Sequence, residues 1–317
     1  MIQRASLSFL LTLFSATSIL ADPGEPDDAL TFFGSRPIYA NGGKANVIGD
    51  DFGWLDDTKT DQQLAQIAAA IEEWSQAGIN YAAYYALGGI ESEAGAAALG
   101  DAGKLVDLDG SYGNSFVFTR SAFREYMINA GKTAIDLGTN YFLLDNASPT
   151  LETLSFDDEI ITDFRTYLEA NYTIGELSSM GVTNVATFDY RDYLKSAPGG
   201  GYTDSNSVND PLYSSPPPGE LWEAWKKNMK DAERAFFEEW TSSIRAYAQS
   251  EYSRDIYFGA NRYTGARQWD NIDKFDFGMA ETFIVSLGYP YYNLDHIYKN
   301  IRNFGKRFWS WNFPANT

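Results

Sequence analysis

The chain has 317 residues, no cysteine and a formal net charge of −19. The lack of cysteine excludes disulfides, thiolate metal sites and cysteine nucleophiles. The negative charge argues against nucleic acid and anionic membrane surfaces as partners, because phosphate groups attract basic proteins.

The first 21 residues have the pattern of a secretory signal peptide. Arg4 is their only charged residue, a mostly apolar stretch runs from Leu7 to Phe14, and small residues lead to Ala21. The apolar stretch is short for a membrane span, so a retained anchor is the weaker alternative. We expect cleavage near Ala21 and a mature chain, residues 22–317, that is secreted or periplasmic.

Strand and helix patterns then alternate along the chain, as in a parallel sheet with crossover helices. Strands are expected at residues 35–41, 79–86, 141–146, 255–261, 275–281 and 307–313. Helices are expected at residues 61–76, 121–138, 157–172 and 220–250. Between them, residues 91–115 are expected to form a surface excursion with a short strand near 104–108. Residues 197–219, rich in Gly, Pro, Ser and Asn, are expected to form a long loop or lid.

This order predicts an α/β protein with one (β/α)8 TIM barrel as its single domain, because seven or eight strands occur without a repeat or a linker. The last strand pattern ends close to Thr317, where a complete barrel normally adds a helix. We therefore expect either truncation after the eighth strand or an N-terminal segment that fills the gap.

Two of the strand patterns end in a carboxylate, at Asp145 and at Glu281. Active sites of these barrels lie at the carboxyl ends of the strands, and two carboxylates are the minimum equipment for glycosidic bond cleavage. We predict Glu281 as nucleophile or base and Asp145 as acid or second carboxylate. The structural alternatives are a helix cap for Asp145 and an ion pair of Glu281 with Arg262 or Arg267.

Further polar and aromatic residues near strand ends are candidates for binding a carbohydrate substrate. Amides and guanidinium groups can bind hydroxyls, and Tyr and Trp rings can stack on the apolar face of a sugar. The candidates are Asn146, Asn261, Arg262, Tyr85, Trp269, Tyr291, Trp309, Trp311 and Asn312. Trp309 and Trp311 share one face of their strand by alternation, and packing is the alternative explanation for the aromatic candidates.

Several other chemistries find no support in the sequence. His296 is the only histidine, so a histidine-rich zinc site is excluded and a Ser-His-Asp triad would have to use His296. The sequence contains no G-x-S-x-G elbow, no P-loop and no dinucleotide-binding glycine motif after a strand. We expect no cofactor and no metal.

The segment from Asn140 to Tyr193 resembles barrel glycosidases of the β-galactosidase type, the family 42-like group of clan A. The similar parts are Leu144-Asp-Asn146, Phe164-Arg-Thr-Tyr-Leu168 and Tyr172-Thr-Ile-Gly-Glu-Leu177. Asp276-Phe-Gly-Met-Ala-Glu281 looks like the strand that carries the nucleophile of that group. The resemblance implies a glycosidase on a (β/α)8 barrel, but the acid/base glutamate of the family falls on Ala147 here.

Three functions remain open on this basis. The first is an exported glycoside hydrolase that uses Glu281 and Asp145. The second is a polysaccharide lyase acting on an acidic sugar, with Arg262 neutralising the uronate and a tyrosine as base. The third is a carbohydrate-binding barrel without activity, which Ala147 favours.

Overall fold

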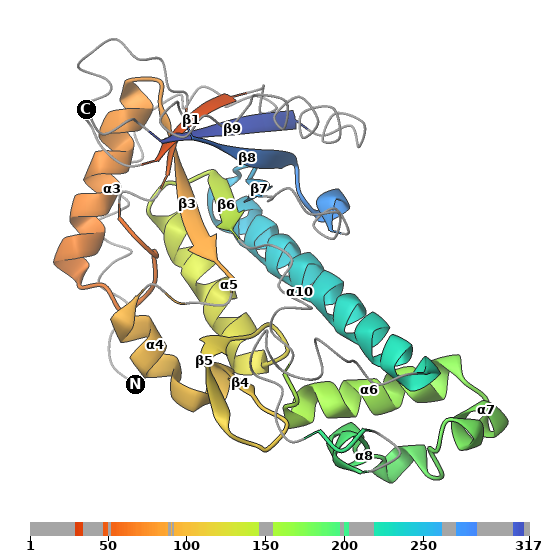
Figure 1. Ribbon diagram of the computed structural model, residues 1–317. Coiled ribbons are helices and arrows are strands. Elements are labelled where there is room, and N and C mark those ends of the chain that lie inside the picture. Colours follow the sequence, from red (N-terminus) through yellow and green to blue (C-terminus); the bar gives the residue numbers. More distant parts are fainter. Residues whose placement is uncertain are drawn as a thin grey trace.

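A computed structural model describes residues 29–33, 47–49, 52–87, 90, 92–145, 155–196, 200–202, 219–261, 271–283 and 307–313 (Figure 1). Within these ranges the backbone alone is described for residues 29–33, 47–49, 261, 272, 279–283 and 307–313. The expected strand at 35–41 lies outside the described residues.

Seven parallel strands of the described ranges form a closed barrel in the order β1-β2-β3-β6-β7-β8-β9. They are β1 (Ala29–Phe33), β2 (Val47–Gly49), β3 (Asn80–Ala86), β6 (Tyr141–Asp145), β7 (Tyr257–Asn261), β8 (Phe277–Phe283) and β9 (Arg307–Phe313). The parallel order follows the prediction. An N-terminal strand closes the ring, because β1 pairs with both β2 and β9.

The strands of the described ring are staggered, and the pairings give the size of the stagger. Counted through β6 and β7, Tyr84 of β3 is level with Phe277 of β8. Counted the other way, through β2, β1 and β9, Asn80 of β3 is level with Glu281 of β8. Asn80 lies four residues before Tyr84 and Glu281 four residues after Phe277. One circuit of the seven described strands therefore shifts the register by eight residues.

Three long helices pack against the outside of the strands, namely α3 (Asp61–Gln76), α5 (Ser121–Asp136) and α10 (Glu220–Tyr252). Their bounds agree closely with the sequence patterns. Thr60 begins α3 with a capping box shared with Gln63, and Ser253 ends α10 in the left-handed conformation. In Figure 1, α10 runs from the strands to the far end of the molecule beside α6.

The alternation of each strand divides the core into two parts. Tyr85, Phe142 and Phe258 belong to the large cluster between strands and helices. Tyr84 and Leu143 belong instead to a small cluster on the inner face of the barrel. Because successive side chains of a strand point to opposite faces, neighbouring residues of β3 and of β6 serve different cores.

Two excursions leave the carboxyl ends of β3 and β6, and they gather at the end of the molecule away from β1 and β9 (Figure 1). The first holds α4 (Glu93–Leu99), the 3-10 turn η1 (Gly100–Gly103), β4 (Lys104–Val106) and β5 (Tyr112–Phe116). The second holds α6 (Asp158–Asn171), α7 (Ile174–Ser179), the turn η2 (Val185–Thr187) and α8 (Tyr190–Lys195). A further turn, η4 (Ile272–Lys274), precedes β8.

The first excursion has more regular structure than its sequence pattern predicts. The pattern indicates irregular structure with one strand, but the structure has a helix and an antiparallel hairpin of β4 and β5. The helix forms because Ser92 caps an alanine-rich segment, its side chain accepting from the amide of Gly95. Small residues favour loops in general, but alanine, which is abundant in this segment, is the best helix former.

Candidate functional site

Asp145 ends β6 on the inner face of the barrel and is hydrogen-bonded to a tyrosine of the neighbouring strand. The hydroxyl of Tyr84 donates to Oδ2 of Asp145 over 2.8 Å. Both side chains are almost covered, with 7% of Tyr84 and 8% of Asp145 exposed. The backbone carbonyl of Asp145 also accepts from the amide of Leu87, which ties the ends of β3 and β6 together.

The barrel is filled below this carboxylate. The inner cluster consists of buried apolar and aromatic side chains, namely Ala82, Tyr84, Tyr141, Leu143 and Phe277, with Ala86 and Tyr257 packed against it. The rings of Tyr141 and Tyr257 stack at 5.4 Å between centroids. On the described inner face of β3, β6, β7 and the start of β8 the barrel is packed, so chemistry at Asp145 would take place at its carboxyl-terminal mouth.

The backbone places Glu281 on the same face and near the same end of the barrel. Glu281 stands four residues after Phe277 in β8, so the two positions share the inner face. Leu144 of β6 is level with Gly278 of β8 through Ala260 of β7. Glu281 therefore stands two positions farther toward the carboxyl end than Asp145, about 6–7 Å along the strand.

Three of the substrate-binding candidates occupy inner-face positions next to these carboxylate positions. Trp311 pairs with Glu281, and Trp309 pairs with Met279 in the same register. Asn261, also paired with Met279, ends β7 between β6 and β8. Asn312 pairs with Thr282 and so takes the opposite face of β9.

Tyr85 does not fit its predicted role in substrate binding. Its side chain is 0% exposed and lies between the strands and the helices. Its hydroxyl donates to the carbonyls of Leu55 and Ala130, each over 3.0 Å. Both positions are tyrosine, so only the strand register shows that Tyr85 faces the outer core and Tyr84 the inner face. The remaining candidates, Asn146, Arg262, Trp269 and Tyr291, lie outside the described residues, as does Ala147.

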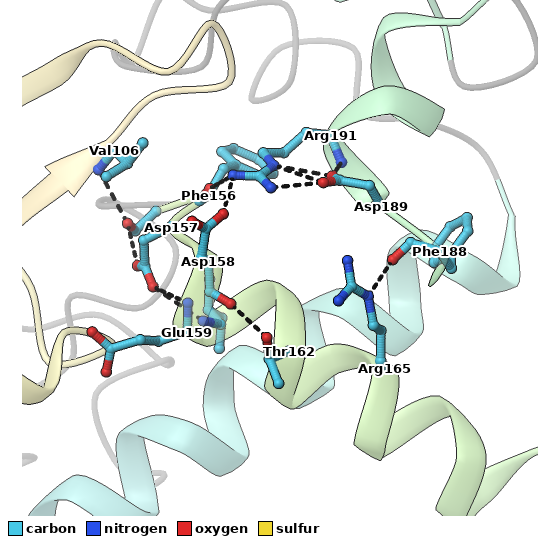
Figure 2. Close-up of polar contacts among 12 residues, drawn as sticks. Val106, Phe156, Asp157, Asp158, Glu159, Thr162, Arg165, Phe188, Asp189 and Arg191 are labelled. Carbon is cyan, nitrogen blue, oxygen red and sulfur yellow. Dashed lines mark hydrogen bonds and ion pairs between the residues drawn. The ribbon is translucent and has the colours of Figure 1, made fainter. Parts of the chain in front are cut away.

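A buried aspartate joins the two excursions beside the barrel mouth. Oδ2 of Asp157 accepts from the hydroxyls of Thr119 and Ser155, each over 2.7 Å, and Oδ1 accepts from the first amides of α6. Val106 of β4 pairs with the adjoining segment, because its carbonyl accepts from Phe156 and its amide donates to Ser155. These contacts, the Asp157 junction, fix the hairpin to the start of α6 (Figure 2).

An arginine on α8 extends this junction (Figure 2). Arg191 forms a two-pronged ion pair with Asp189, a further contact with Asp158 over 2.8 Å, and donates to the carbonyl of Phe156. Burial raises the pKa of Asp189, but the hydrogen bonds and charge of Arg191 outweigh it, so the pKa lies below its usual value. Arg191 thus connects α8 to Phe156 and Asp158, the residues on either side of Asp157.

The residues of α6 that carried the family resemblance have structural roles here. Phe164 and Leu168 are buried in the outer core, and Arg165 donates to the carbonyl of Phe188 over 2.6 Å (Figure 2). They hold the second excursion together and do not reach the inner face of the barrel.

Other features of the described ranges point to no second site. No group of three or more Asp, Glu, His or Cys in them could hold a metal ion. None of their helices has the length and apolar character needed to cross a membrane. An open hollow of about 490 Å³ lies along α3, lined by Phe52, Lys59, Gln63, Gln66, Ile67 and Ala70.

Comparisons with known proteins found similarity in structure alone. No family model and no curated protein sequence matches the chain. The chain is similar to Ega3 of Aspergillus fumigatus in complex with galactosamine, with 12% identity, 92% of this chain and 81% of that chain covered, and a TM-score of 0.43. It is also similar to an exo-β-agarase, with 11% identity, coverage of 85% and 33%, and a TM-score of 0.45. A third similar structure is the agarase AgWH50C, with 11% identity, coverage of 83% and 34%, and a TM-score of 0.40.

The chain spans about a third of the length of the two agarases. All three TM-scores lie below 0.5, so these similarities assign the chain to no family.

Proposed function

We propose that this protein is an exported glycoside hydrolase that cleaves a poly- or oligosaccharide with Asp145 and Glu281 as its two carboxylates. The observation that carries the proposal is Asp145 itself, a carboxylate on the inner face at the carboxyl end of a barrel strand, bound by Tyr84. The next described helix, α6, is capped by Asp157.

The backbone geometry is compatible with a carboxylate pair. Only β7 lies between β6 and β8, so their backbones are about 10 Å apart at roughly 4.8 Å for each strand step. Carboxyl groups of glycosidases are about 5–5.5 Å apart in retaining enzymes and about 6.5–9.5 Å apart in inverting ones. A backbone spacing of this size is compatible with either separation.

In this proposal the neighbouring strand ends supply the sugar subsites. Trp309, Trp311 and Asn261 occupy the inner face beside the carboxylate positions, and Asn146 and Arg262 follow the ends of β6 and β7 in sequence. Trp rings can stack on the sugar, while the amides and guanidinium can bind its hydroxyls. Secretion or periplasmic location after cleavage near Ala21, and likeness to the family 42-like group, belong to the same proposal.

The test is a screen of the purified protein against neutral, amino-sugar and uronate polysaccharides and aryl glycosides, with release of reducing ends as the readout. Asp145→Asn and Glu281→Gln are each expected to lower kcat by at least about 10³-fold, because each removes one of two cooperating groups. Glu169→Gln, an exposed carboxylate on α6, serves as the matched control and is expected to keep full activity.

Full activity in either carboxylate variant would contradict the proposal. Cleavage confined to uronates, with an unsaturated product that absorbs in the ultraviolet, would replace it with a lyase. A well-folded protein that binds a panel member without cleaving it would replace it with a carbohydrate-binding barrel.

A further inference from the structure

Tyr84 stands out on the inner face of β3 as its one large side chain among the described neighbours. The two residues that flank it on that face are Ala82 and Ala86. Ala86 is directly opposite Asp145 and Tyr84 is opposite Leu143. The hydroxyl of Tyr84 reaches the carboxylate of Asp145, two residues beyond the residue that is opposite Tyr84.

The adjacent tyrosine shows how this arrangement differs from packing. The hydroxyl of Tyr85 donates to two backbone carbonyls that belong to the outer core. The hydroxyl of Tyr84 instead donates to a side-chain oxygen at the mouth of the barrel. A ring that only filled the inner core would need no hydroxyl, because burying a hydroxyl is unfavourable unless it is hydrogen-bonded.

The ring that carries this donor is held in place. Leu143 and Phe277 belong to the same buried cluster as Tyr84, and 7% of Tyr84 is exposed. A donor with a fixed ring orients its acceptor, and catalytic groups must be held within about 0.5 Å of their productive geometry.

We propose that Tyr84 is a positioning residue, whose hydroxyl holds Oδ2 of Asp145 so that the carboxylate is presented to the substrate in one orientation. This inference rests on the proposed function, in which Asp145 takes part in glycosidic bond cleavage. Tyr84 acts through Asp145 and fixes its rotamer, while the sugar contacts come from the strand ends above it.

The test uses the full chain and the panel polysaccharide that it cleaves fastest. Tyr84→Phe keeps the ring and removes the hydroxyl, and we expect kcat to fall about 10- to 100-fold with KM changed less than about threefold. Tyr85→Phe is the matched control. It removes a buried hydrogen bond in the outer core, so it lowers the urea midpoint but leaves the kcat of the folded protein unchanged.

A double variant separates positioning from general damage. If Tyr84 acts through Asp145, adding Tyr84→Phe to Asp145→Asn lowers kcat by less than about twofold. Additive losses would overturn the inference, as would a rise in KM with kcat unchanged, which would make Tyr84 a substrate contact.

The two proposals fail in distinguishable ways. An inactive Asp145→Asn beside a fully active Tyr84→Phe overturns the positioning role alone. A fully active Asp145→Asn, or a panel without any cleavage, overturns the proposed function and the positioning role together.

Discussion

The buried aspartates Asp56, Asp145 and Asp157 have different hydrogen-bond partners and therefore different roles. Asp157 accepts from two hydroxyls and two helix amides, which is the pattern of a structural cap. Asp56 accepts from Thr58 and from Tyr126 and connects the start of α3 to α5. Asp145 accepts from Tyr84 on the inner face of the barrel, at the carboxyl end of a strand.

Asp56 gives a prediction on stability against pH. Burial raises its pKa, but the hydrogen bonds from Thr58 and Tyr126 prevail, so its pKa in the folded state lies below the ordinary value of 3.8. Its stabilising effect is therefore complete above pH 3.8 and is lost as the pH falls through the lower, folded-state pKa. Urea midpoints measured between about pH 6 and pH 2.5 should fall more steeply for the unsubstituted protein than for Asp56→Asn.

At about pH 6 we expect Asp56→Asn to cost roughly 1–3 kcal/mol of unfolding free energy, as for other buried hydrogen bonds to charged groups. Asp57→Asn, at the exposed neighbouring position, is the matched control. Parallel profiles for Asp56→Asn and the unsubstituted protein would show that Asp56 does not set the acid limit.

At the scale of the elements, β7 and β8 show how the inner face is filled. Gly259 pairs with Phe277 in the register of the two strands, and the Phe277 ring covers the glycine. The glycine thus makes room for a large side chain on the neighbouring strand, which is one way in which inward-facing positions fit into a narrow barrel. On the outer face, the rings of Phe142 and Phe258 stack on each other and pack against Trp240 of α10.

Gly259→Ala should therefore destabilise the barrel. A Cβ at this position would lie inside van der Waals contact of several atoms of the Phe277 ring, which is itself buried. Overpacking of this kind costs about 1–3 kcal/mol, and we expect a matching loss in the unfolding free energy measured with urea.

Gly175→Ala is the matched substitution for this test. Gly175 is exposed in α7 and has ordinary space for a methyl group, so alanine there should be neutral or stabilising by up to about 1 kcal/mol. Equal effects of the two substitutions would mean that the Phe277 ring moves without cost.

The elements also show the limits of sequence patterns. The helices α3, α5, α6 and α10 were predictable because each has a long apolar periodicity and a clear start or stop signal. The strands β1 and β2 were not predicted. β2 has only three residues, and β1 pairs with β9, which is far away in the sequence. The expected strand at 35–41 falls between them, outside the described residues.

At the scale of the whole molecule, the net charge of −19 should affect stability. Like charges repel one another in the compact state, and salt screens this repulsion, with a Debye length near 30 Å at 0.01 M and near 10 Å at 0.1 M. We expect the melting temperature to rise between these two concentrations of NaCl. The same rise with NaF at equal ionic strength would attribute it to screening.

A fall in the melting temperature over the same range of NaCl would contradict this prediction. It would mean that ion pairs such as Arg191 with Asp189 or Arg245 with Asp276 contribute more than the overall repulsion.

The sequence by itself determined the class of the fold and the two strand ends where chemistry is proposed. The apolar runs that end in Asp145 and Glu281, and the amphipathic helices between them, are local patterns. Such patterns can be recognised from each segment alone. The tertiary structure decided which neighbours these positions acquire. It placed Tyr84 and not Tyr85 against Asp145, because a shift of one residue changes the face of a strand. It also closed the barrel with β1 and joined the two excursions at Asp157, since pairing between distant segments depends on register and packing that no single segment contains.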